Sequence, residues 1–177
     1  MTNEQIRNEV LDMIPFRHME RFELLWTMIT PRYERLTSEQ IEMQKQMENE
    51  RDIFWSALED VTCSVLGVPS QALYTPTRKR EIVNARQIIF FIIRPCYVLS
   101  LQNVGDRYKK DHATILHGIK QASAQVEWDK YYRANVERIC FILNEMGYAK
   151  PMTFFTKFVD HVEHQKTLSA KRKSKIK

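Results

Sequence analysis

The sequence predicts an all-α protein, and three of its features indicate this. Apolar residues recur at helical spacing along most of the chain, and few segments alternate in the manner of a strand. The chain of 177 residues contains 8 methionines but only 4 glycines, a composition that favours helices over tight turns. Hydrophobic residues make up 44% of it, enough for one core of ordinary size to which further helices are attached.

Capping residues, prolines and glycines mark where the predicted helices begin and end. A capping box at Thr37 and Gln40 begins a long helix, and Gly67 ends it. Pro95 is expected to stop an Ile- and Phe-rich helix at the centre of the core, and Pro151 to separate the last two helices. The expected helices are 4–14, 16–29, about 38–66, about 81–94, 101–108, a helix that follows Asp111, 129–146 and 152–167.

The stretch from Ser100 to Tyr108 has the pattern of the first helix of a helix-turn-helix. Ser100 is a favourable N-cap, and Leu101, Val104 and Tyr108 share one face of the short helix that follows. Gly105 is small enough for a second helix to approach this one closely.

The second helix of the motif is predicted to follow a turn at Lys109 and Lys110, with Asp111 as its N-cap. The side chains expected to face the core are Ile115, Leu116 and Ile119, and those left exposed in the first turn are His112, Ala113 and Thr114. In a helix-turn-helix the start of this second helix meets base edges in the major groove, and its N–H groups attract phosphate.

A basic loop precedes the central helix. Arg78, Lys79 and Arg80 follow Thr75-Pro76 in this loop. An arginine so placed can enter a minor groove, where the negative potential of A·T-rich tracts attracts the guanidinium. Phosphate contacts, which position a protein without reading bases, are expected from Arg86, Arg94 and Lys120.

Taken in order, these segments resemble the C-terminal DNA-binding domain (domain IV) of the bacterial replication initiator DnaA. The resemblance covers roughly residues 52–126 and is more specific than a generic helix-turn-helix. The segments that carry it are Arg78-Lys79-Arg80, Ile82-Val83-Asn84-Ala85-Arg86-Gln87, Ser100-Leu101 to Gly105-Asp106, and Asp111-His112-Ala113-Thr114-Ile115-Leu116-His117. It implies a TrpR-like helix-turn-helix bundle, here with extra N- and C-terminal helices.

The resemblance also implies which residues contact DNA. In that family an arginine of the basic loop reads the minor groove, and the start of the recognition helix reads the major groove of a short asymmetric box. The residues implied are Arg78 in the minor groove, Arg86, Gln87 and Arg94 on the backbone, Asp111, His112, Ala113 and Thr114 at the major groove, and Leu101 near it; Lys79, Arg80, Lys109, Lys110 and Lys120 complete the predicted set. Ala113 stands where the family usually has threonine, and the turn lacks the glycine often found there.

Charged residues are distributed unevenly along the chain. Residues 1–60 carry 7 basic and 13 acidic side chains, whereas residues 61–120 carry 9 and 3 and residues 121–177 carry 11 and 6. The positive charge therefore coincides with the helix-turn-helix. The domains expected are an acidic helical N-terminal extension (1–50), a DNA-binding domain (51–126), a C-terminal helical extension (127–169) and a basic disordered tail (170–177). The acidic extension is expected to point away from DNA, toward a protein partner or a second copy.

Other classes of site are not predicted. The phosphate-loop motif Gly-x-x-x-x-Gly-Lys-Ser/Thr is absent, so neither ATPase activity nor a nucleotide cofactor is expected. His161 and His164 have a metal-type spacing but no further ligand nearby, so we expect a solvated helix face and no metal.

The aromatic residues interpreted as core, rather than as a platform for single strands, are Trp128, Tyr131, Tyr132, Phe154, Phe155 and Phe158. Three cysteines without disulfide spacing, and no apolar run near the start, favour the cytoplasm of a bacterial or phage-infected cell and no membrane contact.

The sequence thus predicts a protein, not an enzyme, that binds double-stranded DNA sequence-specifically. It would act by occupancy in replication initiation or its regulation, without ATPase activity, and a phage or mobile element would suit that role. Two alternatives stay open: an interaction or structural module that has kept the fold but lost specific DNA reading, and a transcriptional regulator. The oligomeric state is open as well.

Overall fold

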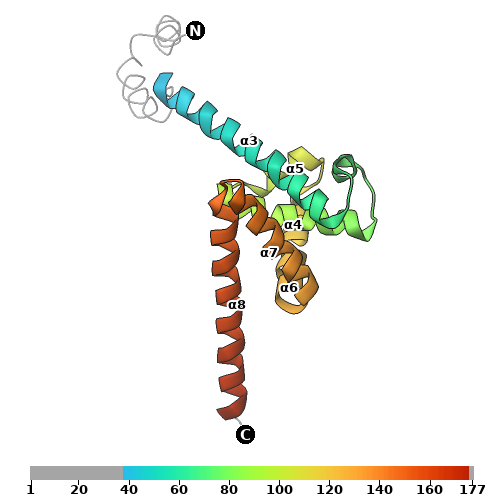
Figure 1. Ribbon diagram of the computed structural model, residues 1–177, viewed down its shortest axis with the longest axis vertical. Helices are drawn as coiled ribbons and strands as arrows, with labels where there is room; N and C mark the ends of the chain where they lie inside the picture. Colours follow the sequence, from blue (N-terminus) through green and yellow to red (C-terminus); the bar gives the residue numbers. More distant parts are fainter. Residues whose placement is uncertain (1–37, 176–177) are drawn as a thin grey trace, which may run out of the picture. The chain divides into compact units, whose positions relative to one another are not determined.

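The computed structural model describes residues 38–175, with side chains over 39–169. Its elements are α3 (Ser38–Leu66), the 3-10 helix η3 (Ser70–Tyr74), α4 (Arg80–Tyr97), α5 (Leu101–Tyr108), α6 (His112–Trp128), α7 (Lys130–Glu145) and α8 (Ala149–Lys175), shown in Figure 1. This part of the chain contains no strand, so the all-α prediction is confirmed. The helices expected at 4–14 and 16–29, and the cap at Thr37, lie outside the described residues.

The chain divides into two compact units, residues 1–46 and residues 47–177. The described part of the first unit is the beginning of α3, whose side chains are exposed over 39–46. The second unit contains the rest of α3 and every later helix. The boundary therefore falls a few residues before the limit of 50 expected from sequence.

Helix α4 is the centre of the core of the second unit, as predicted. Four of its isoleucines, Ile88, Ile89, Ile92 and Ile93, are completely buried. The helix packs against η3, α5, α6 and α8. Its approach to α6 is close at Gly118, where a Cβ atom would lie 3.0 Å from the ring of Phe90.

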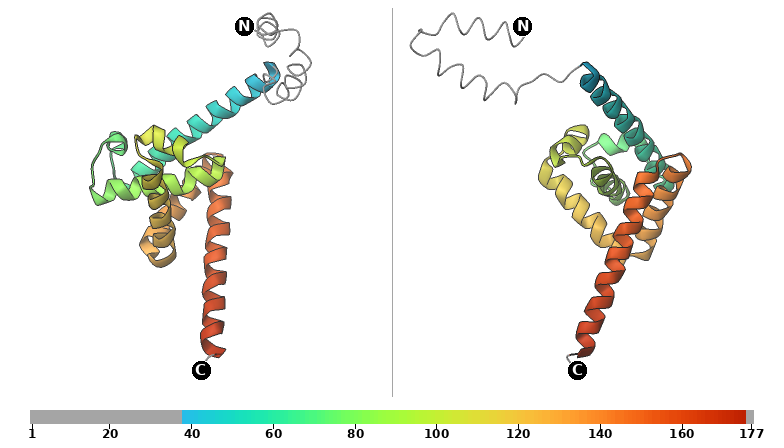
Figure 2. Two further views of the ribbon diagram at one scale, coloured as in Figure 1. Left: turned by 180° about the vertical axis from the view of Figure 1, so that it is seen from behind. Right: turned by 90° about the vertical axis from the view of Figure 1, so that its left-hand side faces the viewer.

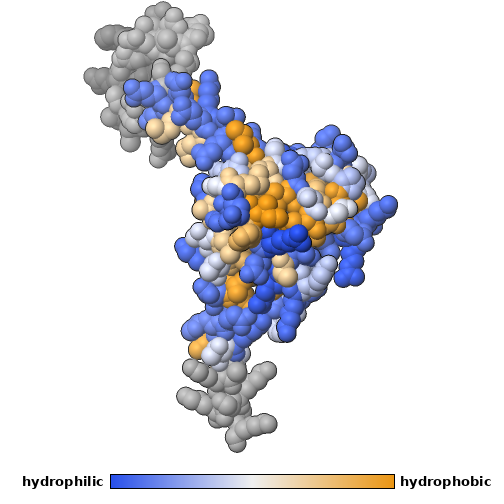
Figure 3. Space-filling model, in the orientation of Figure 1, coloured by the Kyte–Doolittle hydropathy of each residue, from blue (hydrophilic) through white to orange (hydrophobic). Residues whose placement is uncertain are grey.

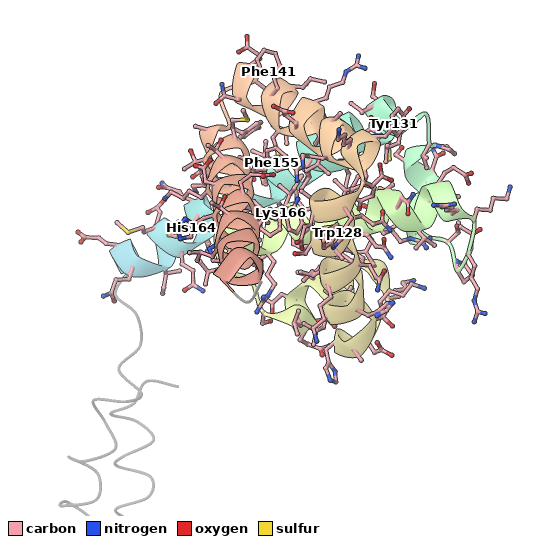
Figure 4. All side chains as sticks on the ribbon, turned by 90° about the horizontal axis from the view of Figure 1, so that it is seen from below. Trp128, Tyr131, Phe141, Phe155, His164 and Lys166 are labelled. Atoms are coloured by element: carbon pink, nitrogen blue, oxygen red, sulfur yellow. The ribbon has the colours of Figure 1, made fainter. Side chains whose placement is uncertain are left out.

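The C-terminal helices share this core rather than forming a separate extension. Val136, Ile139 and Leu143 of α7 and Phe155 of α8 are buried in the same cluster as the helix-turn-helix. Helices α7 and α8 lie side by side in both views of Figure 2. In Figure 4, Phe155 lies between helices, whereas Phe141 lies at the outer edge and is exposed. The residues before and after position 126, where a domain boundary was expected, therefore pack into the same core.

The prediction that Pro95 stops the central helix is wrong. Proline removes the hydrogen bond of its own nitrogen and crowds the carbonyl four residues earlier, but the residues after it keep their N–H groups, so near the end of a helix the last turn can still form. Helix α4 continues to Tyr97 and ends at Val98, which has a left-handed φ of 51°. The N–H groups of Val98 and Leu99 both donate to the carbonyl oxygen of Arg94, which closes the helix end.

The last helix is longer than expected at both ends. Pro151 lies in the first turn of α8, where a backbone N–H has no helical partner to lose, so the helix begins at Ala149 instead of 152. The turn before it uses Gly147, whose φ is 94°. At the other end, α8 continues to Lys175 through most of the segment expected to be disordered from residue 170. None of the helices in residues 38–175 combines the length and apolar character that a membrane span requires.

Candidate nucleic-acid interface

Two side-chain caps shape the helix-turn-helix, and both were predicted. The Ser100 hydroxyl accepts a hydrogen bond of 3.1 Å from the Asn103 N–H at the start of α5. Asp111 accepts one of 2.6 Å from the Thr114 N–H at the start of α6. Between the helices, Lys109 adopts a left-handed conformation with a φ of 52°. A lysine therefore adopts the left-handed conformation at this turn, a position where glycine is the more common residue.

Gly105 permits the close approach at the turn that its small size predicts. A Cβ atom at this position would lie only 2.4 Å from the carbonyl oxygen of Lys110. The Lys110 N–H in turn donates to the Gly105 carbonyl at 2.9 Å. Any side chain at residue 105 would push α6 away from α5.

Helix α6 buries one face and leaves its first turn free. Ile115 is completely buried and Ile119 is half-buried, as expected, but Leu116 is 36% exposed, so the prediction that it faces the core is wrong. Successive helical residues are about 100° apart, and Ile115 and Gly118 already define the buried face. Thr114 is exposed.

The cap residue of α6 adds an anion to this exposed turn. Asp111, His112 and Ala113 are all exposed. Hydrogen bonds from Thr114 lower the pKa of the Asp111 carboxyl, so it is ionised at neutral pH. A carboxylate here accepts from a base-edge amino group but repels phosphate. The first turn of α6 thus suits base contact more than backbone contact.

Arg86 is buried and therefore does not lie on the surface, where a phosphate contact would require it. The side chain of this residue is almost fully buried, and burial lowers the pKa of its guanidinium. Its nitrogens donate to the carbonyl oxygens of Leu73 at 2.7 Å, Ala72 at 2.9 Å and Thr77 at 3.0 Å, and also to that of Thr75. The expected backbone contact is therefore replaced by a structural role: Arg86 holds the loop that leads to Arg78.

A groove of about 420 Å³ separates this loop from the start of α6. Five of the predicted DNA-contacting residues line it: Arg78, Arg86, Gln87, Lys110 and Thr114. The Gln87 side-chain oxygen is buried and has no hydrogen-bond partner. His117, interpreted from sequence as helix packing, also lines the groove and is exposed. Tertiary structure thus brings the basic loop and the recognition helix to the same place.

The remaining predicted residues are spread more widely. Lys79, Lys109 and Lys120 are exposed, and Leu101 is half-buried against the core. Arg80 lines a different hollow, together with Asp129 and Tyr131. Arg94 is exposed and lines a third one, formed with Ile119 and Ser123.

A buried polar cluster supports the first helix of the motif, and sequence analysis missed it. Glu59 of α3 accepts two hydrogen bonds from Arg107, of 3.1 and 2.9 Å. The hydroxyls of Tyr74 and Tyr108 also donate to this carboxylate. Trp55 donates to the Tyr108 hydroxyl at 2.9 Å. The cluster joins α3, η3 and α5, and its pairs are too far apart in sequence for any spacing rule to find them.

Burial and neighbouring charge shift pKa values in this cluster, including those of Tyr108 and Arg107. Burial, followed by the Glu59 carboxylate, raises the pKa of Tyr108 well above its usual value. The hydrogen bonds to Glu59 raise the pKa of Arg107 despite its partial burial. Both residues therefore keep their protons, so the carboxylate keeps its donors.

The histidine pair and the cysteines noted in the sequence can also be located in the structure. No cluster of three potential metal ligands occurs in the described part of the chain, and His161 and His164 are exposed. Burial raises the pKa of the Cys63 thiol to about 11 and those of Cys96 and Cys140 to about 12, which suits packing residues.

The aromatic residues expected in the core divide into two groups. Tyr132 and Phe155 are buried, and Phe154 and Phe158 pack partly buried against the core. Trp128 and Tyr131 are instead 76% and 78% exposed, so the core prediction is wrong for these two. Lys166 lies over the Trp128 ring, 5.4 Å from its centroid, as the labels in Figure 4 allow the reader to follow.

The capped turn, the free start of α6 and the adjacent basic loop define a helix-turn-helix domain. Residues 56–122 match the family described as bacterial dnaA protein helix-turn-helix, which confirms the expected resemblance to the C-terminal domain of DnaA.

Several similar proteins carry the name chromosomal replication initiator protein DnaA. The chain is 36% identical to that of Bacteroides fragilis over 87 residues, which are 49% of this chain and 18% of the relative. It is 31% identical to that of a Synechococcus species over 99 residues, 53% of this chain and 21% of the relative. It is 39% identical to that of Thermomicrobium roseum over 75 residues, 42% of this chain and 16% of the relative. The chain thus matches about a fifth of the length of these relatives.

Proposed function

We propose that this protein binds double-stranded DNA sequence-specifically, with α6 in the major groove and Arg78 in the adjacent minor groove. The observation that carries the proposal is the groove lined by both Arg78 and Thr114, beside a first helical turn with exposed side chains. A major groove admits an α-helix, and an arginine beside it reaches the narrower minor groove.

The residues of the exposed turn differ in what they offer a base. Thr114 and His112 supply hydrogen-bonding groups, and Asp111 supplies an acceptor for a cytosine amino group. Ala113 supplies a methyl group for thymine contact but no hydroxyl. Losing one good base contact should cost roughly 1–3 kcal/mol of binding free energy and relax specificity at one position.

Phosphate contacts are assigned to exposed cations around the motif. Lys79, Lys109, Lys120 and Arg94 are all exposed. Each phosphate neutralised by such a side chain releases counterions, so binding weakens as salt rises. Removing one cation should weaken binding to all duplexes alike.

The role proposed is occupancy of initiator-type boxes in replication initiation or its regulation. The similar proteins are named replication initiators, and the match to them falls on the helix-turn-helix. We propose that the chain acts without hydrolysing ATP and that residues 1–50, rich in acidic side chains, contact a protein partner.

A binding titration tests the proposal. The purified chain is titrated against a labelled duplex that carries a DnaA box and against a scrambled duplex, at about 150 mM salt. We expect a preference of about a hundredfold or more for the box. Equal affinity for both duplexes would contradict sequence-specific reading.

One alternative rests on a specific observation. The exposed aromatic residues Trp128, at the end of α6, and Tyr131, at the start of α7, suit a protein-interaction module that has lost DNA reading. Alanine at Arg78, His112 and Thr114 together separates the two functions. If the unchanged chain does not prefer the box and this variant binds DNA equally well, specific reading by these residues is wrong and the interaction module is the better description.

A further inference from the structure

A second groove shares no lining residue with the groove beside the basic loop. It has a volume of about 410 Å³ and is formed by α4, α6 and α8 together with the turn after α4. The lining residues on which the argument depends are Phe91, Arg94, Val98, Phe154 and Phe158. Apolar side chains gather around α4 on the face shown in Figure 3 and are bordered by hydrophilic ones.

Packed aromatic rings form the floor of this groove. The ring of Phe91 meets those of Phe154 and Phe158 edge-on, with centroids 5.1 Å apart in each pair. Edge-to-face aromatic pairs attract one another beyond the area that they bury, which favours this arrangement of the floor. At the rim, Val98 is 91% exposed, an unusual position for a valine. The groove therefore offers apolar surface that the chain does not cover over its described residues.

The side chains that line the groove include a single charge, and it is positive. Arg94 is the only ionisable residue among them, and it is exposed. An occupant that complements the groove is therefore apolar in its centre and negative at its edges.

We propose that this groove binds an acidic amphipathic helix of a partner protein. Apolar side chains of one helical turn would enter the hollow above Phe91, and a carboxylate on the next turn would pair with Arg94. A volume of about 410 Å³ holds a few side chains rather than a whole domain. DNA fits the charge but has nothing to place against the phenylalanine floor, and a concave surface does not meet a membrane.

The proposal is tested with a phage-displayed library of helical peptides of about sixteen residues, selected against the full chain. The selected peptide is then labelled and titrated. Two substitutions change the charge at the rim without touching the core: Val98→Glu and Val98→Lys. The matched controls are Asn144→Glu and Asn144→Lys, at an exposed position on α7, which does not line the groove.

We expect the selected peptides to place Leu, Ile or Phe at helical spacing next to Glu or Asp. Val98→Glu should weaken binding about tenfold, Val98→Lys should not weaken it, and both Asn144 variants should bind as the unchanged chain does. Selected peptides without acidic residues, or equal binding by both Val98 variants, would overturn the proposal. So would a dimer that Val98→Glu dissociates, because the occupant would then be a second copy.

The peptide titration contains no DNA, so its outcome does not depend on the proposed DNA binding. Arg94 serves both proposals, as a phosphate contact and as the partner of the peptide carboxylate. Val98→Glu, which adds a carboxylate to the groove that Arg94 lines, should therefore weaken binding of the box duplex as well, whereas Asn144→Glu, of equal net charge, should keep both affinities. A failure of DNA binding in the unchanged chain would leave the peptide result standing, and the reverse holds as well.

Discussion

Arg86 donates a hydrogen bond of 2.7 Å from its Nε to the carbonyl oxygen of Leu73, at the end of η3. Three further carbonyls between residues 72 and 77 accept from the same guanidinium. One buried side chain of α4 thereby fixes the path of the loop that carries Arg78. In the proposed complex, Arg86 positions a minor-groove contact without contacting DNA.

Arg86→Ala should reduce both stability and specific DNA binding. Hydrogen bonds to a charged group contribute about 1.5–3 kcal/mol, so we expect a loss of that order in the free energy of unfolding, measured with urea. The slope of log K against log salt should not change, because no phosphate contact is removed. Lys120→Ala is the comparison: stability is kept and the slope falls by about 1. A fall in slope for Arg86→Ala would mean that Arg86 contacts phosphate after all.

Gly105→Ala should disrupt the turn of the helix-turn-helix. The added methyl group would lie 2.4 Å from the Lys110 carbonyl oxygen, a backbone atom that cannot turn aside. We expect a loss of about 1–3 kcal/mol in unfolding free energy, followed by urea denaturation. Gln121→Ala, at an exposed position on α6, provides the control and should change stability by less than about 0.5 kcal/mol. Equal stability of both variants would show that α6 can shift freely.

Glu59→Gln should destabilise the attachment of α5. The amide cannot accept from Arg107 and both tyrosines as the carboxylate does, and it leaves a partly buried guanidinium without its ion pair. Because Arg107 is partly exposed, we expect about 2–3 kcal/mol in thermal or urea unfolding, at the lower end for a buried pair. Asp60→Asn, at the exposed neighbouring position, should be close to neutral. A neutral Glu59→Gln would mean that packing alone holds α5.

Stability should fall as the pH rises above about 9. Burial raises the pKa of the Cys63 thiol to about 11 and that of Cys140 to about 12, from 9.0 in each case. The unfolded chain then loses these protons first, so it gains stability relative to the folded chain from about pH 9 up to about pH 12. Cys140→Ala should show a shallower fall than the unchanged chain when urea unfolding is followed between pH 8 and 11, roughly. An identical slope would mean that Cys140 ionises equally in both states.

Local patterns allowed the caps and the turn to be predicted because their causes are local. Ser100 and Asp111 accept hydrogen bonds from residues three positions later, a distance that sequence displays directly. The error at Pro95 has a local cause too: proline near a helix end costs less than proline in its middle. Leu116 was misassigned because α6, unlike the central helix α4, buries only one face, and only packing selects which of two adjacent apolar residues lies on that face.

By itself, the sequence determined the all-α class, the helix-turn-helix with its caps, and the basic loop before α4, because these depend on helical spacing, capping chemistry and order along the chain. Only the tertiary structure decided that Arg86 is buried in that loop, that Glu59 anchors α5, and that α7 and α8 complete the core. Each of these depends on contacts between residues far apart in sequence, and which distant partners meet is set by how the helices pack, not by any pattern within one of them.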